Sequence, residues 1–229
     1  MRVIIAKKVK GLGVVLNHNY VKIVPIKKKR TFLKIADKKA LKRESILLTS
    51  LQLFSTNGFH RTTIPDIAKA LKMSVGNLYN YFSSKDILAK EIIKYTSDVL
   101  GNEIREVNGL SVSTEEKIQK IVALYFRMAK EKPEMIEYFL RVYLSNREVF
   151  DDGCEGMICV SGFITEIMIF FDDGVASGDL RNQDFFSAFG LFMGYLGGMV
   201  FLKGEEVLPN DIEFYVDDIS RNIYNALKA

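Results

Sequence analysis

Between Lys42 and Lys85 the apolar positions fall into three short stripes with the spacing of α-helices, separated by polar turns. The first stripe places four apolar side chains on one face of a helix over 42–57, namely Ile46, Leu47, Leu51 and Phe54. Asn57-Gly58 ends this pattern as a helix C-cap would. The sequence therefore predicts a first helix that can close a small core with the two that follow.

The second and third stripes each begin with their own cap. Thr63 suits the N-cap of a helix over 64–71, because Asp66 can complete a capping box and Pro65 falls in the first turn. Ser74 suits the N-cap of the next helix. Two short helices joined by a tight turn predict a helix-turn-helix.

In the third helix, Val75, Leu78 and Phe82 follow helical spacing and are expected to face inward. The residues expected to face outward are Gly76, Asn77, Tyr79, Asn80 and Tyr81. Asn can pair with adenine, Tyr can reach phosphate oxygens, and Gly lets the backbone approach closely. This face suits a DNA groove, although helix-turn-helix shapes also occur in proteins that never touch DNA.

This segment resembles the N-terminal DNA-binding domain of the tetracycline-repressor (TetR/AcrR) family. The resemblance is carried by Arg43, Ile46-Leu47, Leu53-Phe54, Gly58-Phe59, Thr62-Thr63-Ile64, Ile67-Ala68, Ser74-Val75-Gly76-Asn77-Leu78-Tyr79, Tyr81-Phe82, Ser84-Lys85-Asp86 and Leu88. One departure is Lys72, where the family usually has Gly with positive φ, so strain or a shifted turn is expected there.

The resemblance implies a DNA-binding set whose members map onto the family motif. Asn77 and Asn80 are expected to meet base edges, while Thr63, Tyr79 and Lys85 are expected to hold phosphates. The full set is Thr62, Thr63, Ser74, Val75, Gly76, Asn77, Tyr79, Asn80, Tyr81 and Lys85.

A basic arm precedes this module. Residues 1–43 hold fourteen Lys and Arg against Asp37 alone, a balance of +13 in a chain of net charge +4, so the remainder carries −9. Such an arm could neutralise phosphates, or it could be a solvated tail or the product of a mistaken translation start. Short strands are conceivable at 3–5, 12–16 and 20–26, interrupted by Lys and Gly.

After Lys85 the pattern is helical to the end of the chain. The expected helices are 84–107, 114–131 with Thr114 as cap, 133–150, 155–171, 184–202 and 209–227, with a loop at Gly174, Ser177 and Gly178. The fold class is therefore predicted as all-α with about nine helices, the usual number in the family. The expected domains are a basic extension (1–35), a helix-turn-helix domain (36–88) and an effector-binding and dimerisation domain (89–229).

The stretch 185–202 is eighteen residues without a charge, long enough for a transmembrane helix. Its acidic neighbours and the amphipathic helix after it favour a buried soluble helix instead. Glycines at four-residue spacing would allow close helix contacts. The resemblance implies that the last two helices form a four-helix bundle with a second subunit, and the expected interface is Gly190, Gly194, Gly198, Tyr215, Ile219 and Ile223.

A homodimer would read a palindromic operator with its two recognition helices. The resemblance implies that a small molecule bound among the central helices releases DNA. The candidate ligand-binding residues are Tyr125, Met128, Phe139, Tyr143, Phe163 and Met168, although for any one of them plain core is the favoured interpretation. The central helices offer few charged residues that could form a fixed anion site. The expected ligand is therefore an uncharged or amphipathic compound or an acyl chain.

Other function classes find little support. No Gly-rich phosphate loop, nucleophile elbow or metal-ligand spacing occurs, so no enzyme, metal or cofactor is expected. Cys154 and Cys159 have neither redox nor zinc spacing, which leaves ordinary thiols or a thiol sensor. With no export signal seen, a cytoplasmic regulator is expected. The alternative is a DNA-binding protein without a small-molecule effector, acting structurally or through a protein partner.

Overall fold

The computed structural model describes residues 12–17, 20–25, 27–142 and 160–229. The chain divides into two compact units, Met1–Ile46 and Leu47–Ala229. In the first unit, β1 (Leu12–Asn17) and β2 (Tyr20–Pro25) form an antiparallel hairpin, with Leu12 opposite Pro25 and Asn17 opposite Tyr20. Outside this hairpin, every regular element in the described residues is helical apart from one isolated bridge, which confirms the all-α prediction from Lys27 onwards.

Helix α1 (Lys27–Asn57) begins well before the predicted boundary at residue 36. No Gly or Pro lies between Lys27 and Asn57, and the Lys, Leu and Ala residues there are good helix formers. The helix therefore continues through the basic segment. It ends where predicted, because Gly58 takes a positive φ of 84° and its N–H bonds the Phe54 carbonyl oxygen at 3.0 Å.

The helix-turn-helix follows as α2 (Ile64–Ala70) and α3 (Val75–Tyr79). Its core contains the residues expected there, with Leu47, Leu51 and Phe54 from α1, Ile67 from α2 and Leu78 from α3 all buried. The Phe54 ring packs edge-on against Phe59 and stacks on Tyr138, with ring centres 5.3 and 6.0 Å apart. The module is therefore joined to the following helical domain through Tyr138.

Two long helices come next, α4 (Lys85–Asn108) and α5 (Thr114–Glu131). Ser84 caps α4, and α5 is capped by Ser113, whose hydroxyl accepts from the Glu116 N–H at 3.2 Å. The prediction of Thr114 as that cap was wrong by one residue, because Thr114 instead donates its hydroxyl to Asp179 at 2.6 Å. After α5, α6 (Pro133–Glu137) continues into a π-helical turn, η1 (Tyr138–Val142).

The remaining described elements are α9 (Ser161–Ala176), α10 (Phe185–Gly204), the 3-10 helix η3 (Ile212–Tyr215) and α11 (Val216–Leu227). Helix α9 ends at Ala176 rather than at Phe171, because Gly174 stays helical and the chain turns at Gly178, whose φ is 80°. The predicted helix 209–227 consists of η3 followed by α11, so helical structure begins at Ile212 and not at Pro209. Phe150, Cys154, Cys159 and the first residues of the predicted 155–171 helix lie outside the described residues.

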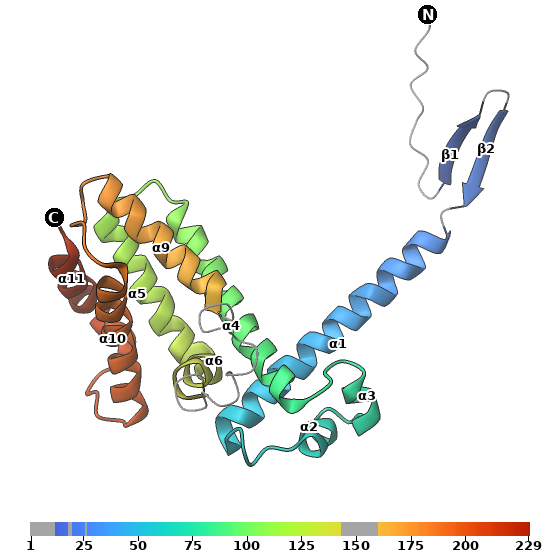
Figure 1. The fold of residues 1–229 in the computed structure, drawn as a ribbon, viewed down its shortest axis with the longest axis horizontal. Helices are drawn as coiled ribbons and strands as arrows, with labels where there is room; N and C mark the ends of the chain where they lie inside the picture. The colour runs from blue at the N-terminus through green and yellow to red at the C-terminus, as the bar shows by residue number, and fades with distance from the viewer. Residues whose placement is uncertain (1–11, 18–19, 26, 143–159) are drawn as a thin grey trace, which may run out of the picture. The chain divides into compact units, whose positions relative to one another are not determined.

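The described residues hold nine α-helices, the predicted number. Helix α4 runs beside α9, while α11 packs on α5 (Figure 1). The α4 and α9 backbones meet at two glycines, where a Cβ on Gly101 would lie 2.7 Å from the Gly162 carbonyl carbon and oxygen. Next to them, the Phe163 N–H donates to the Ser97 hydroxyl at 3.1 Å. This close crossing fixes the position of α4, the helix that leads from the helix-turn-helix into the second half of the chain.

Candidate nucleic-acid interface and core cavity

A complete capping box holds the start of α2. The Thr63 N–H donates to the Asp66 carboxylate at 2.9 Å, and the Asp66 N–H donates to the Thr63 hydroxyl at 3.3 Å. The Thr63 hydroxyl also donates to the Asp66 carboxylate, and this hydrogen bond and that from the Thr63 N–H lower the pKa of Asp66. The sequence prediction of this cap is confirmed. Thr63 itself is exposed at the helix N-terminus, where backbone N–H groups favour an anion such as phosphate.

The turn between α2 and α3 accommodates Lys72 in a left-handed conformation with a φ of 51°. The Met73 N–H bonds the Ala68 carbonyl oxygen at 2.9 Å, and the Lys72 N–H bonds that of Lys69 at 3.1 Å. This pair of hydrogen bonds is the Schellman arrangement that usually contains Gly. The turn thus keeps its family geometry with a non-Gly residue that carries some strain, and Lys72 is exposed.

Helix α3 presents a polar face to solvent. Its cap is Ser74, whose hydroxyl accepts from the Asn77 N–H at 3.2 Å, while Leu78 and Phe82 anchor the helix in the core. The residues on this face are Val75, Gly76, Asn77, Tyr79 and Asn80, all exposed, with Ser74 and Tyr81 at its ends. The expectation that Val75 faces inward was wrong, since 37% of it is exposed at the start of the helix.

Two residues of the predicted DNA-binding set have partners within the protein. Thr62 is 1% exposed, and its hydroxyl donates to the carbonyl oxygens of Gly58 at 2.9 Å and Leu53 at 3.2 Å, so it closes the end of α1 and does not face DNA. The Lys85 ammonium donates to the carbonyl oxygens of Phe59 at 3.0 Å and Thr62 at 3.2 Å. Lys85 therefore holds the α1–α2 turn in this structure instead of extending into solvent.

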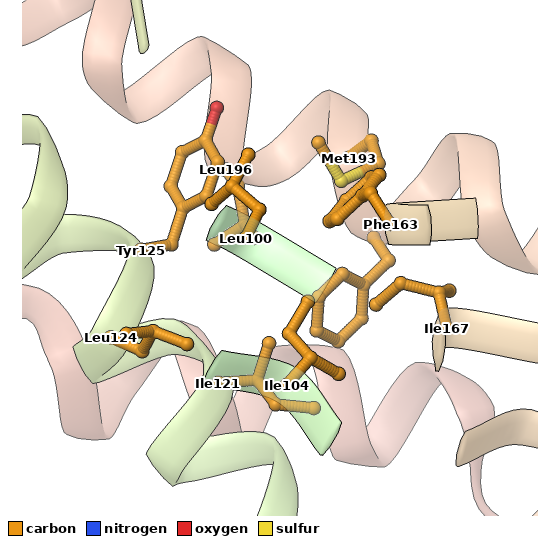
Figure 2. A pocket seen from close by; sticks show the side chains of 10 residues that line it. Leu100, Ile104, Ile121, Leu124, Tyr125, Phe163, Ile167, Met193 and Leu196 are labelled. Carbon is orange, nitrogen blue, oxygen red and sulfur yellow. The ribbon is translucent and has the colours of Figure 1, made fainter. Parts of the chain in front are cut away.

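A small cavity lies between α4, α5, α9 and α10 (Figure 2), with a volume of about 10 Å³. It is lined by Leu100, Ile104, Ile121, Leu124, Tyr125, Phe163, Ile167, Phe192, Met193 and Leu196. Of the predicted ligand-binding residues, Tyr125 and Phe163 line it. Sequence reasoning missed Leu100 and Ile104 of α4, because helical spacing does not distinguish a cavity wall from ordinary core.

The other predicted ligand-binding residues lie elsewhere. Met128 and Phe139 are buried core residues outside the cavity lining, and Phe139 packs edge-on against the Phe163 ring at 5.8 Å. Met168 is 41% exposed, so it does not belong to the described cavity wall. Tyr143 lies outside the described residues.

The predicted dimer residues fall into two groups. On α10, a Cβ added at Gly190, Gly194 or Gly198 would meet nothing within 4 Å in the described chain. On α11, Ile219 and Ile223 are 5% and 0% exposed within the chain itself. Their assignment to a subunit interface was wrong, because the apolar face of α11 packs on α5 of the same chain. Tyr215 is partly exposed.

The outer face of α10 carries large apolar side chains as well as the glycines. Phe186, Leu191, Phe201 and Leu202 are 62%, 37%, 64% and 37% exposed. The opposite face, with Ala188, Phe192, Leu196 and Met199, is buried in the chain. By length and composition alone α10 could cross a bilayer, and 22% of its most apolar stretch is buried. We call the exposed side of α10 the outer α10 face.

Together, the capped helix pair and the polar face of α3 form a helix-turn-helix module that is followed by a helical domain. The family model for bacterial regulatory proteins of the tetR family matches residues 46–92. Among curated proteins, the transcriptional regulator HbdR of Aromatoleum sp. (strain CIB) is 37% identical over 71 residues, which are 31% of this chain and 31% of HbdR. The chain thus spans about a third of the length of this relative.

A longer match is to IcaR of Staphylococcus aureus (strain Newman), the negative transcriptional regulator of the biofilm operon icaADBC. It is 28% identical over 156 residues, 66% of this chain and 80% of IcaR. The structure of FadR from Bacillus subtilis in complex with stearoyl-CoA has a TM-score of 0.69 at 17% identity, covering 78% of this chain and 96% of that one. Residues 46–92 thus match the tetR-family model, and the fold of the chain is similar to that of FadR.

Proposed function

We propose that this protein is a cytoplasmic repressor that binds a palindromic operator as a homodimer and is released by a small apolar or amphipathic ligand. The observation that carries the proposal is the solvent-facing surface of α3, with two amides and a phenol on a helix capped at Ser74 and anchored by Leu78. The alternation of exposed polar and buried apolar positions supports insertion of this face into a major groove.

The proposed contacts separate into two kinds. Asn77 and Asn80 have the donor and acceptor pair that can recognise adenine, so they are the proposed base-reading residues. Tyr79, 48% exposed, and the Thr63 end of α2 are proposed phosphate contacts. Lys72 adds a cation at the turn between the helices. Lys85 is left out of the phosphate contacts, because its ammonium already has two carbonyl partners.

The outer α10 face supports a subunit interface. A contiguous apolar surface of this kind in a soluble protein usually marks a contact with another molecule, and glycines let two helix backbones approach closely. A bilayer is a poorer fit, because the other side of α10 packs into the chain and the Lys203 ammonium donates to the Ala129 carbonyl oxygen of α5 at 2.9 Å. A second copy of the chain is the proposed partner.

Ligand release is supported by the position of the cavity. Leu100 and Ile104 of α4 form part of its wall, and α4 starts directly after the helix-turn-helix. A molecule that enlarges the cavity would therefore displace the helix that carries the DNA-binding module. FadR, of the same fold, binds stearoyl-CoA, and IcaR is a negative regulator, which supports a ligand with a large apolar part and a repressing role.

A second candidate is a DNA-binding protein without a small-molecule effector. The size of the cavity favours it, since about 10 Å³ is roughly the space of one water molecule. In that case the described core would need no bound ligand. Regulation would then come from a protein partner or from the concentration of this protein in the cell.

Selection of duplexes from a random library by the purified chain tests the proposed DNA function. We expect enriched duplexes that share a palindrome with half-sites about one helical turn apart, or a multiple of it. Enrichment of unrelated sequences, with affinity that depends on salt alone, would contradict an operator-specific role.

A further inference from the structure

A groove with an apolar and a polar part lies between the end of α9 and the start of α10, and we call it the α9–α10 groove. Its volume is about 220 Å³. This is below the roughly 300–1,000 Å³ of pockets that hold drug-sized ligands, so the groove suits one small molecule. None of its lining residues lines the core cavity. The two are therefore separate sites.

Hydrogen bonds hold the segment that closes the groove between the two helices. The Leu180 N–H donates to the Gly174 carbonyl oxygen of α9 at 2.9 Å, and the Arg181 N–H donates to that of Leu227 in α11 at 3.0 Å. Leu180 also forms an antiparallel bridge with Lys228. The segment is thus fixed from two sides. A ligand would meet a groove that already exists, and its binding would not have to order a loop.

The floor of the groove is apolar. Phe171, Leu180 and Ala188 line it and are 7%, 3% and 4% exposed. The Phe171 and Phe185 rings meet edge to face with their centres 6.1 Å apart. An apolar side chain laid on this floor would lose contact with water, and an aromatic ring could pack against the two phenylalanines.

The polar part of the groove has one charge of each sign. Asp172 comes from α9 and Arg181 from the segment after it, and both are exposed. The Arg181 Nε–H donates to the Gln183 side-chain oxygen at 3.1 Å, which uses one of the five N–H donors of the guanidinium. Among the described residues, no ion pair joins Asp172 to Arg181. The groove thus offers an anion partner and a cation partner at the same time.

This pair of charges selects the kind of ligand. A simple anion drawn to Arg181 would also be repelled by the Asp172 carboxylate, and a simple cation would meet the reverse difficulty. A molecule that carries one positive and one negative group complements both side chains.

We propose that the α9–α10 groove binds a free α-amino acid with a large apolar side chain. Its carboxylate contacts Arg181, its ammonium group contacts Asp172, and its side chain lies over Phe171 and Phe185. This inference goes beyond the DNA function proposed above and depends neither on DNA nor on the core cavity.

The test compares four probes by isothermal titration calorimetry with the full chain near neutral pH. L-Phenylalanine has both charges and an aromatic side chain, and we expect it to bind saturably. Phenylacetate lacks the ammonium group and 2-phenylethylamine lacks the carboxylate, so each should bind at least about fivefold more weakly. Glycine has both charges but no apolar side chain, and it should bind more weakly than L-phenylalanine by at least about tenfold.

Substitutions locate the binding site. Asp172→Asn should weaken L-phenylalanine binding about fivefold, and its neighbour Asp173, exposed but outside the groove, gives the matched control Asp173→Asn. Arg181→Met should have a similar effect, with Arg221→Met on α11 as control. Ala176→Phe, at the exposed last residue of α9, should fill the groove and abolish binding. Its melting temperature without probe should equal that of the wild type, which shows that the fold is intact.

Three results would overturn the proposal: no saturable binding of L-phenylalanine, equally tight binding of phenylacetate or 2-phenylethylamine, or wild-type affinity in Ala176→Phe. The calorimetry contains no DNA, so its outcome is separate from the selection of duplexes. A chain that selects an operator but does not bind L-phenylalanine would contradict this inference alone. A chain that binds L-phenylalanine in the groove but selects no duplex would contradict the DNA function alone.

Discussion

The ammonium group of Lys85 lies 4.3 Å from the centre of the Phe59 ring and donates a hydrogen bond to the Phe59 carbonyl oxygen at 3.0 Å. The same group also donates to the Thr62 carbonyl oxygen. Lys85 is the first residue of α4, and Thr62 directly precedes the cap of α2. One side chain therefore ties the start of α4 to the turn that positions the helix-turn-helix.

Lys85→Met tests this role, since it keeps the apolar stem and removes the charged donor. We expect a decrease of about 1–2 kcal/mol in the free energy of unfolding, because the variant lacks hydrogen bonds from a charged group, although solvent screens a partly exposed one. Urea denaturation without DNA measures it. The matched control is Lys94→Met, an exposed position on the same helix, which should change stability little. Equal stability of both variants would return Lys85 to the phosphate-binding set.

The glycine crossing of α4 and α9 makes a second prediction. A Cβ on Gly101 would lie 2.7 Å from two backbone atoms of Gly162, which cannot move aside as a flexible side chain could. Gly101→Ala should therefore destabilise the protein by about 1–3 kcal/mol. Gly109→Ala is the control, because Gly109 has a φ of −71° and an added Cβ there would make only ordinary contacts at 3.6 Å, so the variant should change stability little. Thermal unfolding that ranked the two variants the other way would show that the helices do not meet closely at Gly101.

The sequence predicts the local elements of the DNA-binding module well. The caps at Thr63 and Ser74 and the end of α1 at Gly58 depend on neighbouring residues, so short patterns are sufficient to place them. The unusual φ of Lys72 likewise agrees with the motif, which needs positive φ at that turn.

The sequence does not show which helix packs against an apolar face, or which groups accept a hydrogen bond from a given side chain. The family resemblance assigns the apolar face of α11 to a second subunit, yet Ile219 and Ile223 pack within the chain, and an amphipathic pattern does not say which helix covers it. Likewise Thr62 and Lys85 match the family motif, but their hydrogen bonds depend on carbonyl groups exposed by the α1–α2 turn. The errors at α11 and at Thr62 and Lys85 thus have one cause. In each case the partner is set by the folded arrangement of the chain, which a local sequence pattern does not give.

Gly194→Leu tests the outer α10 face as a dimer interface. A bulky side chain at a close helix crossing should weaken the dimer by about 1–3 kcal/mol. The protomer itself should stay as stable as the wild type, since nothing in the described chain lies within 4 Å of an added Cβ. Sedimentation over a dilution series reports the first effect and thermal unfolding the second. An unchanged dimer at all dilutions would remove Gly194 from the interface.

Deletion of residues 1–30 tests the basic arm. The deleted segment contains nine Lys and Arg and no acidic residue, and the deletion shortens α1 by only its first four residues. We expect DNA affinity to become less dependent on salt, while the preferred operator stays the same. The slope of log K against log salt should decrease by about 0.9 for each phosphate that the arm neutralises. An identical slope for the truncated and full chains would mean that the arm does not touch DNA.

The most direct test of α3 as the recognition helix is the base preference of Asn80→Ala and Asn77→Ala, determined by gel-shift titration on the selected operator and on its single-base variants. If α3 reads the major groove, each substitution should lower operator affinity by about 1–3 kcal/mol and relax discrimination at one base pair of each half-site, with the other positions still discriminated. The fold should be unaffected, because both side chains are exposed. Unchanged affinity and unchanged base preference in both variants would contradict the assignment of α3 as the recognition helix.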